Sequence, residues 1–270
     1  MAIAAFSLAV SVSVTSLVSM STARPDDMCP TVVVAHRGYH ENHAENTMPA
    51  LYAAVKRGAD VVEGDLRVSA NDDLMLIHDG TLRRTTNGRG YVRHHTGPQI
   101  HRLRTAGGHR VPYILQFLRF VRRHPNIRGV LEVKSDRAVE LLYRRLRGFG
   151  LGPRLTVSSM QARRLKEAEE RRPHARRQLI TTHRMHGRRL ARFADWISLP
   201  AAKLSPGYVE RMHEHGIRIQ LRATSNRSAW DKAMRLGVDA ISTDDVPELL
   251  ERCRTRTWKR LLREGARGGS

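Results

Sequence analysis

The chain has 270 residues, of which 40% are hydrophobic and 5% aromatic, so it can bury a substantial core made mainly of aliphatic side chains. Lys and Arg number 47 against 26 Asp and Glu, giving a formal net charge of +21. Beyond residue 23 no stretch is long and apolar enough to cross a bilayer, which excludes a multispanning membrane protein. The charge favours anionic partners, such as phosphorylated substrates, lipid surfaces, cell-wall polymers or nucleic acid, although a merely solvated basic surface is the alternative.

Residues 1–23 contain no charged side chain and end in Ser21-Thr22-Ala23, a small-x-small pattern typical of signal-peptide cleavage. We therefore expect a secreted, extracellular protein. The alternative is an N-terminal membrane anchor, because the stretch is almost long enough to span a bilayer, but its many Ser and Thr residues make it a poor span.

From residue 31 onward, short β-branched or apolar runs alternate with amphipathic stretches. Strands are predicted at 31–35, 59–68, 74–77, 129–133, 155–158, 177–180, 196–199, 217–221 and 238–242. Helices are predicted at about 46–58, 112–123, 137–147, 161–172, 206–215, 228–236 and from 247 onward. Residues 81–110 differ, because they are rich in Arg, His and Gly and show no apolar period. We expect a partly ordered, basic loop excursion there.

About eight alternations over roughly 240 residues are typical of a parallel α/β (β/α)8 TIM barrel. A doubly wound open sheet is the structural alternative. We expect residues 31–262 to form a single catalytic domain and residues 263–270 a disordered tail. The even number of cysteines in an exported chain predicts a disulfide between Cys29 and Cys253, which a closed barrel would bring together; two free thiols are the alternative.

Residues suited to phosphate chemistry stand where predicted strands end. His36 and Arg37 follow the first strand, and Glu63 and Asp65 lie two apart on the second. Alternate strand residues point to the same side about 7 Å apart, so two such carboxylates repel each other unless a cation lies between them. Hard oxygen ligands suit one divalent cation, Ca²⁺ or Mg²⁺.

Two later pairs complete this pattern. Glu132 and Lys134 end the strand near residue 131, where Glu132 is a candidate third ligand and Lys134 a candidate phosphate contact; a buried Glu–Lys pair is the alternative. His78-Asp79 follows a further extended run. Two histidines opposite a metal predict general acid–base catalysis on a phosphoester, with the metal and Arg37 or Lys134 neutralising phosphoryl charge.

The ordered set of motifs resembles the glycerophosphodiester phosphodiesterases from about residue 31 to residue 250. Its parts are His36-Arg37-Gly38, Glu45-Asn46-Thr47, Glu63-Gly64-Asp65, His78-Asp79 with TLRRTTNGRG after it, LEVK at 131–134 and GVDAISTDD at 237–245. The resemblance implies a (β/α)8 barrel that hydrolyses glycerophosphodiesters to sn-glycerol 3-phosphate and an alcohol with a divalent metal. It implies that His36 and His78 are catalytic, that Glu63, Asp65 and Glu132 bind the metal, and that Arg37 and Lys134 contact phosphate. Glu45, Asn46 and Asp79 are candidate supporting residues.

The sequence departs from the family in two places. The family often has a Trp-Thr-x-Asn segment after the seventh strand, whereas the nearest match here is Ala223-Thr224-Ser225-Asn226, without an aromatic residue. The chain is also unusually rich in histidine around residues 40–43 and 94–95; His40, His43, His94 and His95 are candidate substrate or metal contacts, with surface histidines as the favoured interpretation.

Two other functions stay open at this point. One keeps the fold and changes the substrate, to a phospholipase D-like reaction or a teichoic-acid-type polymer, because the aromatic wall is missing and residues 81–110 are basic. The other is a non-enzymatic polyanion-binding protein, which the charge favours and the paired carboxylates disfavour. We expect no specific nucleic-acid partner, but an anionic cell-wall or lipid surface is a candidate one.

Overall fold

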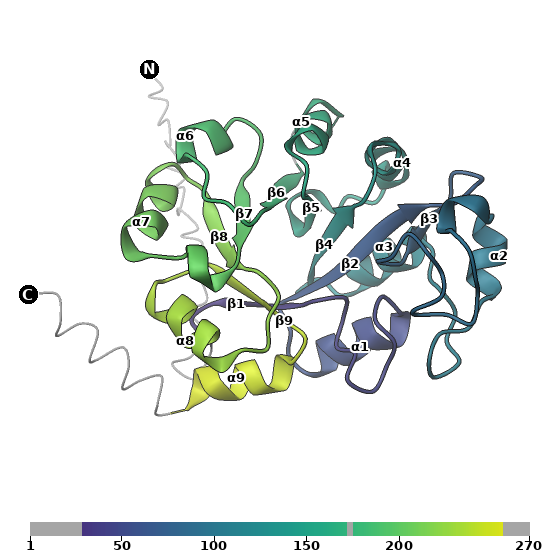
Figure 1. Ribbon diagram of the computed structural model, residues 1–270, viewed down its shortest axis with the longest axis horizontal. Coiled ribbons are helices and arrows are strands. Elements are labelled where there is room, and N and C mark those ends of the chain that lie inside the picture. The colour runs from purple at the N-terminus through teal and green to yellow at the C-terminus, as the bar shows by residue number, and fades with distance from the viewer. Residues whose placement is uncertain (1–28, 172–174, 256–270) are drawn as a thin grey trace, which may run out of the picture.

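The computed structural model describes residues 29–171 and 175–255, and within them eight parallel strands close into a barrel (Figure 1). Strand β1 pairs with β2 on one side and with β9 on the other, which completes the ring and confirms the predicted (β/α)8 fold. The barrel strands are β1 Val32–Ala35, β2 Val61–Val68, β4 Arg128–Val133, β5 Leu155–Ser159, β6 Arg176–Ile180, β7 Trp196–Leu199, β8 Arg218–Leu221 and β9 Ala240–Thr243.

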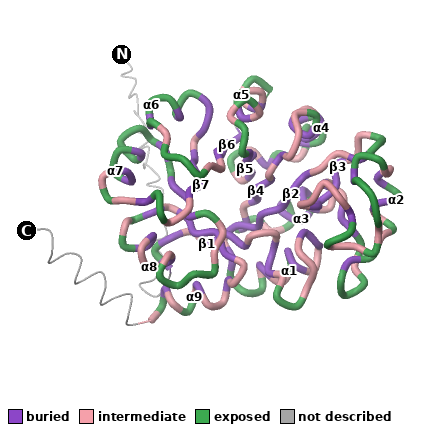
Figure 2. Tube along the Cα trace, in the orientation of Figure 1, coloured by how far each residue is buried: buried purple, intermediate pink, exposed green. Residues whose placement is uncertain are grey.

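Helices surround the barrel and bury one face each against it (Figures 1 and 2). Helix α3 illustrates the rule, because Ile114, Phe117, Leu118 and Val121 recur at helical spacing and are all buried. The surrounding helices are α1 Met48–Lys56, α3 Ile114–Arg123, α4 Asp136–Leu146, α5 Ala162–Arg171, α6 Gly187–Leu190, α7 Pro206–Glu214, α8 Arg227–Arg235 and α9 Val246–Arg254. Short 3₁₀ turns are η2 Gly152–Arg154 and η3 Ala201–Lys203.

The run at residues 74–77 is not a barrel strand. It forms β3 (Leu74–Leu76), which pairs antiparallel with the far end of β2 and leads the chain away from the barrel (Figure 1). Residues 81–110 then form the 3₁₀ turn η1 (Val92–His94) and helix α2 (Gly97–Arg102). A small cluster separate from the main core anchors them, made of Met75, Ile77, Leu82, Val92, Ile100 and Val111. This excursion is therefore more regular than its irregularly spaced apolar residues indicate.

The predicted disulfide is confirmed, because Cys29 and Cys253 are bonded with their Cα atoms 4.7 Å apart. It joins the residue that precedes β1 by three positions to the last turn of α9. The predicted export signal at 1–23 and the predicted tail at 263–270 lie outside the described residues. Among the described helices, none has the length and apolar character needed to cross a membrane.

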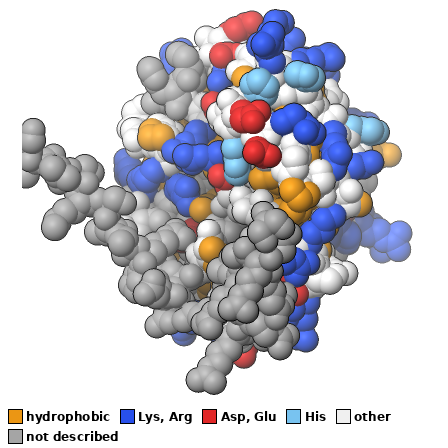
Figure 3. All heavy atoms as spheres, turned by 90° about the vertical axis from the view of Figure 1, so that its left-hand side faces the viewer, with side chains coloured by type: hydrophobic (Ala, Val, Ile, Leu, Met, Phe, Trp, Pro, Cys, Tyr) orange, Lys and Arg blue, Asp and Glu red, His pale blue; other side chains and the backbone are white. Residues whose placement is uncertain are grey.

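The positive charge does not form one single patch on the face shown in Figure 3. Where that face is not covered by grey atoms, Lys and Arg side chains lie in several separate groups, with Asp, Glu and His side chains between some of them. Several of the arginines form ion pairs, such as Arg137 with Glu140 at the surface and Arg252 with Asp231 in a partly buried position. The chain therefore offers a diffuse field that attracts anions over a broad area.

Candidate active site

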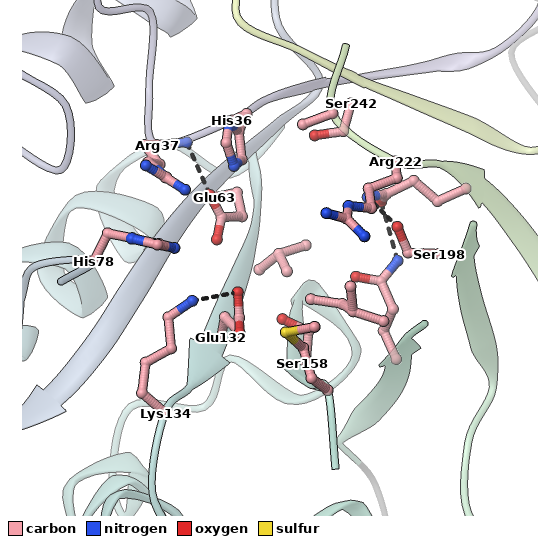
Figure 4. Close-up of a pocket in the computed structure, with 16 residues that line it drawn as sticks. His36, Arg37, Glu63, His78, Glu132, Lys134, Ser158, Ser198, Arg222 and Ser242 are labelled. Carbon is pink, nitrogen blue, oxygen red and sulfur yellow. Dashed lines mark hydrogen bonds and ion pairs between the residues drawn. The ribbon is translucent and has the colours of Figure 1, made fainter. Parts of the chain in front are cut away.

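A cavity of about 210 Å³ opens at the carboxyl ends of the barrel strands, the end where TIM-barrel enzymes carry their chemistry (Figure 4). It brings together residues that are distant in the chain. The predicted site residues that line it are His36, Arg37, Glu63, His78, Glu132 and Lys134.

The turn after β1 places a backbone N–H group beside the carboxylate of Glu63. Arg37 has a φ of 56°, and its backbone N–H donates to Glu63 Oε2 at 2.8 Å. Gly38 follows with a φ of 80°, and a Cβ there would lie 2.7 Å from the carbonyl carbon of Ala50. Only glycine fits this close approach to helix α1, so the turn depends on the local sequence His36-Arg37-Gly38.

Three carboxylates converge because of strand register. Glu63 and Asp65 lie on the same side of β2, and Asp65 is the direct neighbour of Glu132 on β4. One ligand oxygen from each lies within 4.8 Å of the other two. Glu63 and Asp65 are 8% and 1% exposed, so water does little to screen their mutual repulsion.

Positive and amide groups hold the cluster in place. Lys134 Nζ lies 2.9 Å from Asp65 Oδ1 and 2.7 Å from Glu132 Oε2. Asn46 clamps Asp65 twice, because its Nδ2 donates to Asp65 Oδ2 at 2.8 Å while the Asp65 backbone N–H donates to Asn46 Oδ1 at 2.9 Å. Arg37 Nε lies 3.2 Å from the same Oδ2. Asn46 adopts a φ of 57°, a conformation that asparagine tolerates better than most residues.

Lys134 and the Arg37 side chain contact Asp65 or Glu132, whereas Glu63 accepts from the backbone N–H of Arg37. Burial and the charge of Asp65 raise the pKa of Glu63 to about 8. For Asp65, burial acts in the same direction, but the charges of Lys134 and Arg37 outweigh it and lower its pKa. A buried three-carboxylate cluster with oxygen donors at this spacing fits a divalent cation, whose charge would favour the ionised form of all three.

Each candidate histidine is held by a carboxylate. His36 Nδ1 lies 2.8 Å from Asp244 Oδ1, which leaves Nε2 toward the cavity. Burial alone would lower the pKa of His36, but the hydrogen bond that His36 donates to Asp244 and the charge of Glu63 raise it above its usual value. His40 Nε2 reaches the same Asp244 oxygen at 3.1 Å. Despite its partial burial, these two bonds hold the pKa of Asp244 well below its usual range.

On the other side of the cavity, His78 Nδ1 lies 2.7 Å from Asp79 Oδ1. Arg84 fixes Asp79, because its Nε donates to Asp79 Oδ2 at 2.6 Å. The same guanidinium donates to both oxygens of Glu45, at 2.8 and 2.7 Å, and Glu45 in turn accepts from Arg37 at 3.0 Å. The hydrogen bond from Arg84 is the main cause that lowers the pKa of Asp79.

Asp244 and Arg84 were not singled out by the sequence. Both lie inside quoted motifs, GVDAISTDD and TLRRTTNGRG, but a motif alone does not tell which of two adjacent acids or arginines faces the site. The structure distinguishes them, because Asp245 instead caps α9 by accepting from the Glu248 backbone N–H at 3.1 Å. His43, His94 and His95 are not among the residues that line the cavity.

The floor of the cavity is polar. TIM barrels usually fill this layer with branched aliphatic side chains, whereas here Gln178 on β6 donates to Gln220 on β8 at 3.0 Å. Serines complete the layer: Ser158, Ser198 and Ser242. At the mouth of the cavity, Arg222 and Ala223 follow β8 where the family often carries an aromatic residue. The sequence did not identify this polar layer, because Ser and Gln inside a strand are usually read as facing solvent.

Comparison with known proteins agrees with this arrangement. The glycerophosphoryl diester phosphodiesterase family matches residues 36–248 of the chain. A glycerophosphodiester phosphodiesterase of Caldanaerobacter subterraneus subsp. tengcongensis is 27% identical over 242 residues, covering 82% of this chain and 96% of the relative. One from Bacillus altitudinis is 25% identical over 231 residues, covering 79% and 94%.

Solved structures show the same fold. A glycerophosphodiester phosphodiesterase from Parabacteroides distasonis superposes with a TM-score of 0.77 at 22% identity, over 85% of this chain and 99% of that one. An Oleispira antarctica phosphodiesterase in complex with the product sn-glycerol-3-phosphate gives 0.77 at 20% identity, over 83% and 97%. The family match spans most of the chain and includes all the carboxylates and histidines of the cavity, and the chain therefore belongs to the glycerophosphoryl diester phosphodiesterase family.

Proposed function

We propose that the chain hydrolyses glycerophosphodiesters to sn-glycerol 3-phosphate and an alcohol, with one divalent cation and two histidines as acid and base. One observation carries the proposal: in a member of this family, Glu63 and Glu132 line one cavity with two carboxylate-held histidines, and the buried Asp65 completes their carboxylate cluster. The product complex of the Oleispira antarctica relative supports glycerol 3-phosphate as the product.

Glu63, Asp65 and Glu132 would hold the cation, and their hard oxygen donors suit Ca²⁺ or Mg²⁺. When bound, the cation would supply Lewis-acid neutralisation of the phosphoryl charge. Arg37 and Lys134 add positive charge at the same wall, where they would contact phosphoryl oxygens. Asn46 keeps Asp65 oriented through its paired hydrogen bonds, and Glu45 keeps Arg37 in place.

The two histidines would move the protons. Because Nδ1 of each is occupied by a carboxylate, Nε2 is the atom that would exchange a proton with the substrate. The raised pKa of His36 favours its protonated form and suits it to protonate the leaving alkoxide. His78 would then take the proton from the attacking hydroxyl, which belongs either to water or to the neighbouring glycerol carbon of the substrate.

An assay of glycerol 3-phosphate release tests this proposal. We expect activity to disappear with EDTA and to return with Ca²⁺ or Mg²⁺, and His36→Ala and His78→Ala each to lower kcat by about 100-fold or more. His94→Ala is the matched control, because this exposed histidine does not line the cavity. Near wild-type activity in either catalytic variant would remove that histidine from the mechanism.

A second candidate keeps the chemistry and changes the substrate to a lysophospholipid or a teichoic-acid-type polymer. The absence of an aromatic side chain at Ala223 and the basic residues at 81–110 favour it. Phosphorus NMR of the products from soluble diesters, lipids and polymers separates the two candidates. It also detects a cyclic phosphate, which forms only if a substrate hydroxyl attacks.

We also propose that the chain works outside the cytoplasm. The Cys29–Cys253 disulfide supports an oxidising compartment, and residues 1–23 have the composition of an export signal. An anionic cell-wall or lipid surface is the partner that its charge would attract there. Fractionation of expressing cells, with mass determination of the mature N-terminus, distinguishes a cleaved signal from a retained anchor.

A further inference from the structure

Arg222 stands on the wall of the cavity opposite the carboxylates. It directly follows β8, where its backbone N–H donates to Leu199 O at 2.8 Å. In the barrel order β1, β2, β4, β5, β6, β7, β8, β9, strand β8 lies four positions from β4 in either direction. Strand β4 carries Glu132 and precedes Lys134. Figure 4 accordingly shows the Arg222 guanidinium pointing into the cavity from the side away from Lys134.

Among the described residues, the charge of Arg222 has no acidic partner. The other cations at the cavity have carboxylate partners: Arg37 pairs with Glu45 and Asp65, and Lys134 with Asp65 and Glu132. Within residues 29–171 and 175–255, no carboxylate forms an ion pair with the Arg222 side chain. An exposed guanidinium at a cavity mouth, with five donors and no acidic partner, is suited to bind an anion from outside.

The cavity floor supplies an independent sign of a polar ligand. Ser158 lines the same cavity, is 0% exposed, and its hydroxyl has no hydrogen-bond partner in the described part of the chain. Burying a hydroxyl without a partner is costly, so such a group is expected to be satisfied by a ligand or by water. The cavity thus offers polar groups well beyond the three carboxylates and their cations.

We propose that Arg222 is a specificity-determining residue that binds a second anionic group, a phosphate or carboxylate, on one of the two alcohol substituents of the diester. The inference rests on the proposed function, since it assumes that the reacting phosphate lies at the Glu63, Asp65 and Glu132 wall. A substituent that extends from this wall across the cavity reaches β8. An aromatic residue at that wall would stack on a neutral or cationic substituent, whereas a guanidinium selects an acidic one.

Three diesters that differ in charge test the proposal: glycerophosphocholine, glycerophosphoglycerol, and glycerophosphoglycerol carrying a terminal phosphate. We expect wild-type kcat/KM to rise along this series, with a gain of about tenfold from the terminal phosphate, as charge-assisted hydrogen bonds provide. Arg222→Gln should abolish the gain, mainly through KM, and Arg222→Lys should restore part of it. Arg218→Gln is the matched control, because it removes an exposed arginine from the other end of the same strand.

Calorimetric binding of the last two diesters in EDTA, where turnover stops, provides a second reading of the same preference. If the terminal phosphate raises kcat/KM or binding affinity by the same factor in wild type and in Arg222→Gln, the inference is overturned while the proposed function stays intact. The same would follow if Arg218→Gln lost the preference as fully, because that result assigns it to overall charge. If wild type hydrolyses none of the three diesters, the proposed function fails, and the binding measurement alone decides whether Arg222 recognises the second anion.

Discussion

Loss of the Cys29–Cys253 disulfide should lower the stability of the protein substantially. The bond joins residues 224 positions apart, so it constrains almost the whole described chain in the unfolded state. In the folded state it links the lead into β1 to the end of α9, two elements that already lie together. The bond therefore acts mainly by reducing the conformational entropy of the unfolded chain.

The size of the effect follows from the loop length. For a loop this long, the chain-entropy relation gives a loss of about 5 kcal/mol in the free energy of unfolding when the bond is removed. For a domain of this size, each kcal/mol corresponds to about 2–4 °C in Tm. The expected fall is therefore about 10 °C or more.

Thermal unfolding of the oxidised protein, with and without a reducing agent, measures this difference directly. The Cys29→Ala/Cys253→Ala double variant should melt near the reduced wild type and should not respond to the reductant, which controls for other effects of the reagent. A fall in Tm of less than about 2 °C in both tests would refute the entropic argument, since it would mean that the unfolded state is little constrained by the bond.

Three further predictions concern the site. Asp79→Ala should lower kcat by about 10–100-fold with little change in KM, because it removes the acceptor that orients His78; a change confined to KM would contradict this role. Saturating Ca²⁺ at 100 times its Kd should raise the free energy of unfolding by about 2.7 kcal/mol, and Glu132→Gln should reduce this gain; an unchanged Tm in wild type would argue against a resident cation. In metal-free protein, the pKa of Glu63 is about 8 when folded and about 4.3 when unfolded. Protonated Glu63 therefore contributes fully to the free energy of unfolding below about pH 4, and this contribution is lost as the pH rises to 8. Between pH 5 and 8 wild type should therefore lose about 1 kcal/mol per pH unit relative to Glu63→Gln in denaturant unfolding, whereas parallel profiles would count against the raised pKa.

Much of the fold could be predicted because strand and helix periods alternate regularly. The sequence also indicates that Glu63 and Asp65 share one side of a strand, since side-chain direction in a strand has a period of two. The sequence alone does not predict that Asp65 and Glu132 are paired on adjacent strands, because the register between β2 and β4 is fixed by packing over the whole barrel. It became predictable only through the family resemblance.

The remainder depends on tertiary contacts. The run at Leu74–Leu76 has the composition of a buried strand, but composition does not specify whether a strand pairs parallel inside the barrel or antiparallel beyond it. Arg84 is one of many arginines in a basic stretch, and only its geometry shows that it bridges Glu45 and Asp79. Arg222 is similarly indistinguishable from a surface arginine until β8 is placed opposite β4.

The closure of the barrel through β1 has a consequence for how the protein is made. One edge of β1 pairs with β2, only some thirty residues further along, as Val34 with Val61. Its other edge pairs with β9, and the partner of Val32 there is Ala240, near the end of the chain. During synthesis the first strand therefore keeps an unpaired edge until almost the entire sequence has emerged, and an incomplete chain exposes it to other chains. Truncation within α8 should thus leave an aggregation-prone open sheet rather than a smaller barrel.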